Sequence, residues 1–274
     1  MVRVALFAVL LAVIGGAAAG VGALVGNGSA ASRATSGDEM AMSAAANGLA
    51  STADGYSFVP AATSLHPGRN LFRFRILDDA GRPTHRFDLE GGVRLHLLLA
   101  RRDLTGYQHL HPRLRGDGSW AIPIDIDEPG VYRAFADFEV DGKKTVLGRD
   151  LFVAGDFRAA SPPRPTARSS AGPYRVRMES GVLHAGQETR IAFAVSRAGH
   201  PVESFQQYIG ARGHLVALHA GDLSYAHVHP FDEGDAGRID FRAELTEPGR
   251  YRLFLQFKRD GRVYTAPFAV EVAR

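Results

Sequence analysis

The chain repeats part of its own sequence at a spacing of 118 residues. Leu-His-Pro-Gly at 65–68 returns as Leu-His-Ala-Gly at 183–186, and Tyr-Gln-His-Leu-His-Pro at 107–112 returns as Tyr-Ala-His-Val-His-Pro at 225–230. Four histidines coincide at this spacing, where about a quarter of one coincidence is expected by chance. Such self-similarity marks a duplicated structural unit. The sequence therefore predicts two domains of one fold.

The repeat also indicates where the domains begin and end. After one inserted residue, Pro-Gly-Val-Tyr at 129–132 returns as Pro-Gly-Arg-Tyr at 248–251. The segment between the two copies is rich in Pro, Ser and Arg, which is typical of an interdomain linker. We therefore predict domains at residues 54–156 and 173–274, joined by a linker at 157–172.

Each copy has the pattern of an all-β domain. Segments such as 70–77, 93–100 and 131–140 are short and rich in apolar, β-branched and aromatic residues, and turn signals such as Asp141-Gly142 separate them. About seven such strands in roughly 100 residues are typical of an immunoglobulin-like β-sandwich. No helical periodicity of useful length follows residue 53. The predicted fold class is therefore all-β, with two tandem immunoglobulin-like β-sandwich domains.

The N-terminus has the pattern of an export signal. A basic start, Met1-Val2-Arg3, precedes an uncharged apolar stretch that continues to residue 26. The stretch is long enough to cross a membrane as a helix, so residues 1–26 are expected to be a signal peptide or a membrane anchor. Residues 27–53 are small and polar and are expected to form a disordered tether. Either alternative predicts an extracytoplasmic protein, secreted or held by a single-pass anchor.

Composition excludes several classes of function. The net charge is only +3 and the basic residues are scattered, which argues against a nucleic-acid partner. The chain has no cysteine, so disulfides, thiolate metal sites and cysteine nucleophiles are excluded. Histidine is the unusual residue, with 11 copies unevenly placed along the chain.

The histidines of the first copy are spaced to share one face of a hairpin. A two-residue turn at 102–103 would place His96 directly opposite His109, and cross-strand partners have Cβ atoms about 5 Å apart. His111 lies two residues farther along the strand, so it returns to the same face. A three-residue turn would instead move His96 to the opposite face.

The second copy contains the same set, His214, His227 and His229. Three neutral imidazoles on one rigid face suit Cu(II) or Zn(II), whose bonds to nitrogen are about 2 Å long. His66 and His184 each precede a strand and are possible fourth ligands. These residues predict one copper or zinc site in each domain.

Two segments resemble a known group of exported bacterial domains. The pattern is a strand histidine, then Asp-Leu, an aromatic residue, His-x-His-Pro at 109–112, and Pro-Gly-x-Tyr at 129–132, and the second copy follows it. It resembles the YtkA-like and broader CopC-like immunoglobulin-type domains. This resemblance implies copper or heavy-metal handling in the cell envelope.

The leading hypothesis is an extracytoplasmic metal-binding protein without enzymatic activity. Its expected partners are a metal ion and the membrane through the N-terminal segment, with a protein of the cell envelope as a further candidate. Two alternatives stay open. The histidines could be structural, in a module that binds another protein. Less favoured is a hydrolase that uses a histidine-bound metal with an open position for water.

Overall fold

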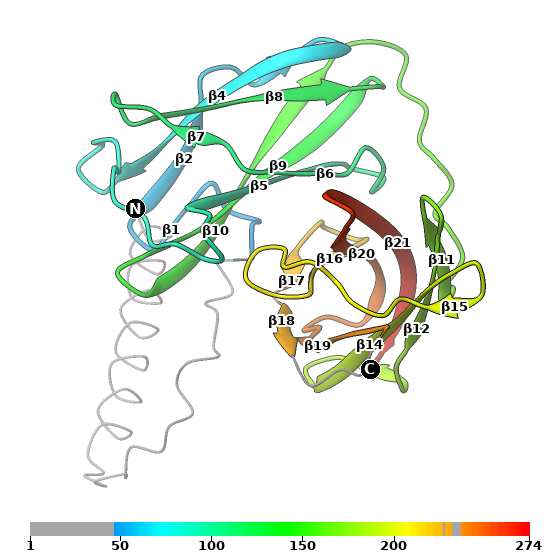
Figure 1. The fold of residues 1–274 in the computed structure, drawn as a ribbon. Helices are drawn as coiled ribbons and strands as arrows, with labels where there is room; N and C mark the ends of the chain where they lie inside the picture. Colours follow the sequence, from blue (N-terminus) through cyan, green and yellow to red (C-terminus); the bar gives the residue numbers. More distant parts are fainter. Residues whose placement is uncertain (1–46, 227, 232–236) are drawn as a thin grey trace, which may run out of the picture. The chain divides into compact units, whose positions relative to one another are not determined.

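The computed structural model describes residues 47–226, 228–231 and 237–274, and residues 42–274 form one compact unit. The predicted N-terminal helix at 1–26 and residues 27–46 of the predicted tether lie outside the described residues. The end of the tether, 47–53, was expected to be disordered but is part of the fold, because its backbone bonds to β10 (Lys143–Val153) and its last two residues form β1 (Thr52–Ala53). Among the described residues, no helix has the length and apolar character needed to cross a membrane. Every regular element in these ranges is a β-strand (Figure 1).

The first repeat is built from two sheets of five strands each. In spatial order, the outer sheet contains β1 (Thr52–Ala53), β2 (Tyr56–Pro60), β4 (Gly68–Asp78), β8 (Ser119–Ile126) and β7 (Arg113–Leu114). The inner sheet contains β3 (Ser64–Leu65), β10 (Lys143–Val153), β9 (Gly130–Val140), β5 (Leu95–Arg101) and β6 (Gln108–Leu110).

The second repeat has the same strand order. Its outer sheet contains β11 (Arg168–Ala171), β12 (Tyr174–Glu179), β14 (Glu188–Arg197), β19 (Arg238–Glu244) and β18 (Val228–Phe231), with β15 (His200–Pro201) paired to β14. Its inner sheet contains β13 (Leu183–His184), β21 (Arg262–Ala273), β20 (Gly249–Arg259), β16 (Gly213–His219) and β17 (Tyr225–Ala226). Strand β11 uses the last residues of the segment predicted as a linker.

The topology is that of an immunoglobulin-like sandwich, which confirms the predicted fold class. The first edge of each sandwich is divided between the sheets, and its second part, β3 or β13, runs parallel to the last strand. Each repeat also has a tyrosine corner, the hydrogen bond that fixes the entry into the sixth strand of such folds. The hydroxyl of Tyr132 donates to the Glu128 carbonyl at 2.8 Å, and that of Tyr251 donates to the Glu247 carbonyl at 3.0 Å.

Each sandwich has its own apolar core, and a third apolar cluster joins the two repeats. Strand β5 is buried on both faces, because Leu97 and Leu99 enter the core of its own sandwich while Leu98 and Ala100 enter the shared cluster. The outward face of β16 enters the same cluster through Val216. The inner sheets therefore pack against each other, which hides the faces that carry His96 and His214.

Equivalent residues of the two repeats make corresponding contacts with the other repeat. Tyr107 stacks on Phe254 with ring centroids 3.8 Å apart, and its counterpart Tyr225 lies 6.3 Å from Phe135, the counterpart of Phe254. A Cβ on Gly91 would lie 2.3 Å from the carbonyl carbon of Ile209, which is the residue 118 positions later. Only glycine fits this approach, so the two copies meet through equivalent segments, as the halves of a symmetric dimer do.

Candidate metal centre

The hairpin formed by β5 and β6 places two predicted ligands on one face. The prediction paired His96 with His109, but the observed partner of His109 is Leu98, so the register differs by two residues. The connection is longer than predicted, with left-handed backbone at Leu104 and Gly106. Because side chains alternate with a period of two, a two-residue shift keeps both histidines on the same face.

Three imidazoles from both repeats converge at the contact between the inner sheets. One ring nitrogen from each of His96, His109 and His214 lies within 4.8 Å of the others. The rings of His96 and His214 are parallel, with an interplanar angle of 4° and centroids 5.5 Å apart. The ring of His109 is 5.1 Å from His96 and 4.7 Å from His214. His111 joins the group, with its centroid 4.9 Å from His109 and 5.2 Å from His96.

This arrangement corrects the predicted distribution of sites. We expected one site in each domain, but the described histidines form one cluster in which His214 of the second repeat completes a set from the first. His229 is exposed on β18, a strand of the outer sheet, and is near enough to Glu90 to contribute to the lowered pKa of that carboxyl group. His227 lies outside the described residues.

The predicted fourth ligands lie elsewhere. His66 follows β3, which is three strands away from β5 in the inner sheet, or about 14 Å at the usual strand spacing. Its Nδ1 is 2.9 Å from the Pro67 carbonyl. His184 ends β13 at the equivalent edge, and its Nδ1 is 3.3 Å from the carbonyl of Arg274. Neither residue can reach the cluster.

Burial keeps the clustered imidazoles neutral. Desolvation lowers the pKa of His96 to about 4, although the nearby carboxylate of Glu90 acts in the opposite direction. Burial also lowers the pKa of His109 and of His214 well below the ordinary value, and lowers the pKa of His111. A neutral imidazole retains one nitrogen lone pair, which is the form that binds a metal.

A hydrogen-bonded chain fixes the tautomers of two rings. His109 Nδ1 lies 2.5 Å from Gln256 Oε1, and because that oxygen only accepts, His109 Nδ1 carries the proton. His109 Nε2 therefore has the lone pair and accepts from His96 Nδ1 at 2.9 Å. The other nitrogen of His96, Nε2, is left without a hydrogen-bond partner, as are the buried Nε2 atoms of His111 and His214. Buried polar atoms rarely lack a hydrogen-bond partner, so each of these three nitrogens needs an explanation.

Charged groups border the cluster. Lys144 Nζ is 2.8 Å from Glu90 Oε2, which in turn is 3.8 Å from His96 Nε2. Asp137 is paired with His96 across β5 and β9, accepts a hydrogen bond from the Tyr225 hydroxyl at 3.1 Å, and lies 3.9 Å from Lys144. Burial raises the pKa of Asp137 to about 6.

Sequence reasoning missed these bordering residues. A signal existed, since Asp137 and Gln256 occupy equivalent places, each paired with the strand histidine of its own repeat, His96 or His214. The two residues differ in type, so identity between the two copies does not reveal them.

Comparisons with solved structures give only distant similarity. The chain is similar to the Escherichia coli adhesin FdeC, at 13% identity and a TM-score of 0.27, covering 81% of this chain and 65% of that one. It is also similar to the fibronectin(III)-like modules of Clostridium thermocellum CbhA, at 10% identity and a TM-score of 0.23, covering 80% of this chain and 93% of that one. No curated protein matches the sequence.

A family model matches both repeats, at residues 51–154 and 168–274. Its description is a domain of unknown function, DUF8832. These two ranges include most of the chain and both sandwiches, so the chain belongs to the DUF8832 family, with two tandem copies of its domain.

Proposed function

We propose that the protein binds one Cu(II) or Zn(II) ion between its two repeats. The observation that carries this proposal is the convergence of His96, His109 and His214, each with a ring nitrogen within 4.8 Å of the other two. Nitrogens bound to one such ion at about 2 Å are roughly 3 to 4 Å apart, so the rings need only small movements. The sandwich fold supplies rigid strands that hold them.

The surroundings fit the requirements of ligating histidines. A metal-bound imidazole usually donates its second N–H to an oxygen acceptor, which orients the ring. Gln256 already accepts from His109 Nδ1 at 2.5 Å and leaves Nε2 for the ion. Glu90 is placed to do the same for His96, because its carboxylate is 3.8 Å from His96 Nε2. An ion at His96 Nδ1 would replace the proton that this nitrogen now shares with His109.

Nearby carboxylates would offset the charge of the ion. Three neutral imidazoles add no charge, so a divalent cation in this half-buried place needs anions close by. Glu90 and Asp137 provide them, and the ammonium group of Lys144 neutralises part of that negative charge in the absence of an ion. Although burial opposes it, the two carboxylates raise the pKa of Lys144.

A second candidate is a structural or protein-binding module in which the histidines are not ligands. It is favoured by the chain of hydrogen bonds from His96 through His109 to Gln256, which already joins the two repeats without an ion. A pair of immunoglobulin-like sandwiches in contact also suits a binding role in the cell envelope. We place the protein outside the cytoplasm because of its N-terminal sequence, and we propose binding rather than catalysis.

Metal titration of the full-length chain, purified without a histidine tag and stripped with a chelator, separates these candidates. The expected result is one equivalent of Cu(II) or Zn(II) per chain, lost in His96→Ala and equally in His214→Ala. His66→Ala and His184→Ala are the matched controls and should keep the full equivalent. Two equivalents per chain would contradict the shared site, and no binding by a folded chain would favour structural histidines.

A further inference from the structure

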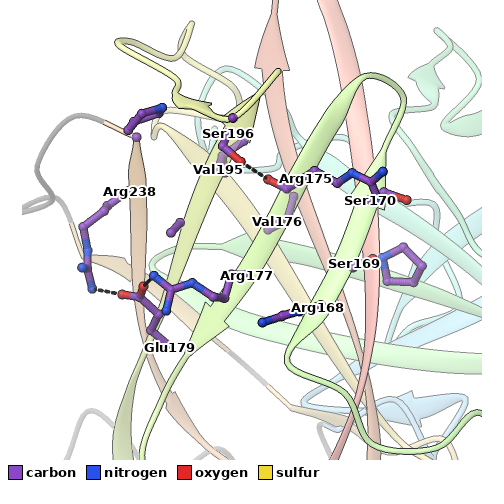
Figure 2. A pocket seen from close by; sticks show the side chains of 15 residues that line it. Arg168, Ser169, Ser170, Arg175, Val176, Arg177, Glu179, Val195, Ser196 and Arg238 are labelled. Atoms are coloured by element: carbon purple, nitrogen blue, oxygen red, sulfur yellow. Dashed lines mark hydrogen bonds and ion pairs between the residues drawn. The ribbon is translucent and has the colours of Figure 1, made fainter.

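The outer sheet of the second repeat carries a basic groove that shares no residue with the histidine cluster. Its volume is about 940 Å³. The lining residues come mainly from β11, β12, β14 and β19, and Figure 2 shows their side chains on the sheet face. Charged and hydroxyl side chains make up most of them, namely Arg168, Arg175, Arg177, Arg238, Glu179, Ser169, Ser170 and Ser196.

Strand register aligns these residues in two rows that cross the sheet. In the first row, Arg168 pairs with Arg177 and Ala194 separates Arg177 from Arg238. Four adjacent strands span about 14 Å at the usual spacing, so three guanidinium groups border a strip of that length. The small side chain of Ala194 leaves the middle of the strip hollow.

The second row carries hydroxyl groups beside a fourth guanidinium. Ser170 pairs with Arg175, and Arg175 pairs with Ser196 on the next strand. Side chains two residues apart on a strand share a face, so Arg175 and Arg177 project from the same side of β12. Guanidinium groups with neighbouring hydroxyls are donors that match carboxylate, sulfate and phosphate oxygens.

The positive charges of the groove are only partly neutralised. Glu179 accepts ion pairs from both Arg177 and Arg238, the latter at 2.7 Å (Figure 2). Arg168 and Arg175 form no ion pair with any described carboxylate, and both are exposed. The lining therefore carries a net charge of +3, as much as the whole chain. Arg168 and Arg177 are direct cross-strand neighbours, and such like-charge pairs destabilise a sheet.

The outer sheet of the first repeat has exposed arginines of its own on β4, namely Arg69, Arg73 and Arg75, but not these two rows. At the equivalent positions of its outer sheet, Ser57, Val59 and Ala61 stand in place of Arg175, Arg177 and Glu179. The same fold therefore forms without the basic rows. A costly feature present in one copy only is better explained by a ligand than by folding.

We propose that this groove binds an acidic polysaccharide. A linear polymer of this kind would place successive carboxylate or sulfate groups along the row of arginines. The neutral hydroxyls of its sugar units would lie against Ser170 and Ser196. Among the described residues, no aromatic side chain lines the groove, so they offer none of the stacking surfaces that single-stranded nucleic acids use. The two rows run across β11, β12, β14 and β19 rather than along one strand, so an extended acidic peptide that paired with the edge strand β11 could not follow them.

Binding of fluorescently labelled heparin and polygalacturonate to the full-length chain tests this proposal. Heparin carries sulfate and carboxylate groups and polygalacturonate only carboxylates, so the pair distinguishes the two kinds of anion. We expect both to bind, and neutral dextran not to bind. In Arg168→Ala/Arg177→Ala, affinity should fall about tenfold or more, and the slope of log K against log salt should fall by about two.

The control is Arg69→Ala/Arg73→Ala, which removes two exposed charges from β4 of the first repeat. This variant has the same net charge as the groove variant and should keep its affinity. Thermal unfolding of both variants shows that a loss of binding is not a loss of fold. Equal losses in the two variants, or tighter binding of poly-glutamate or single-stranded DNA than of either polysaccharide, would overturn the proposal. Metal titration gives an independent readout of the histidine cluster.

Discussion

Acid should destabilise the metal-free protein through His96. The unfolded chain protonates this imidazole near pKa 6.5, whereas burial lowers the pKa of His96 in the folded protein to about 4. Between these values the unfolded state binds more protons, so stability falls as pH decreases from about 6.5 toward 4. The contribution of the neutral His96 ring to stability is fully present above about pH 6.5 and lost below about pH 4.

The size of this effect follows from the pKa difference. A shift of 2.5 units corresponds to about 3.4 kcal/mol once the pH is below both values. Between pH 7 and pH 5, the linkage relation gives a loss of about 2 kcal/mol. Burial lowers the pKa of His109 and of His214 as well, which adds to the loss. The raised pKa of Asp137, about 6, acts in the opposite direction, so the total for the wild type is smaller than the sum of the histidines.

A pair of variants isolates the contribution of His96. Urea unfolding of the metal-free chain at pH 7 and pH 5 gives the free energy of unfolding of the wild type and of His96→Gln, which cannot titrate. The difference between them should change by about 2 kcal/mol between the two pH values. His200→Gln, which replaces an exposed histidine of β15, is the matched control. If His96→Gln had the same pH dependence as the wild type, the ring would not be buried and neutral between the repeats.

Three further results are expected. Tyr251→Phe removes the hydrogen bond to the Glu247 carbonyl and should lower the free energy of unfolding by about 1 kcal/mol, measured by urea denaturation. Phe254→Ala removes the ring that stacks on Tyr107 between the repeats and should cost about 3 to 5 kcal/mol in the same assay. Zn(II) or Cu(II) at a hundred times its dissociation constant should stabilise the wild type by about 2.7 kcal/mol, and calorimetry should show no such gain in His214→Ala.

The sequence predicts the sandwiches well because their determinants are local. Alternation, turn signals and the repeat spacing all act within one domain, and the Pro-Gly-x-Tyr segments that end at Tyr132 and Tyr251 form the corners that begin β9 and β20. The shared face of His96 and His109 is predicted for the same reason, although the register is two residues off. Because side chains alternate between the two faces of a strand, a register error of two residues leaves both histidines on the same face.

The contact between the repeats could not be predicted in the same way. Leu98 and Val216 face away from their own cores, and a strand that is apolar on both faces only indicates that something covers it. The sequence does not indicate that each repeat covers the other, so it predicts one site in each domain. The single cluster follows from the contact between the repeats, which brings His214 beside His96.

The small differences between the copies explain why the shared cluster would hold one ion rather than two. A perfect two-fold arrangement would place each side of the cluster in the same environment. Here Glu90 borders the side of the first repeat, whereas Tyr208 stands at the equivalent position in the second repeat, and burial raises the pKa of Tyr208 to about 12. Asp137 likewise has Gln256 as its counterpart. Among the described residues, the anions are therefore concentrated on one side, beside His96, and a second divalent ion on the other side would have no compensating carboxylate from this part of the chain.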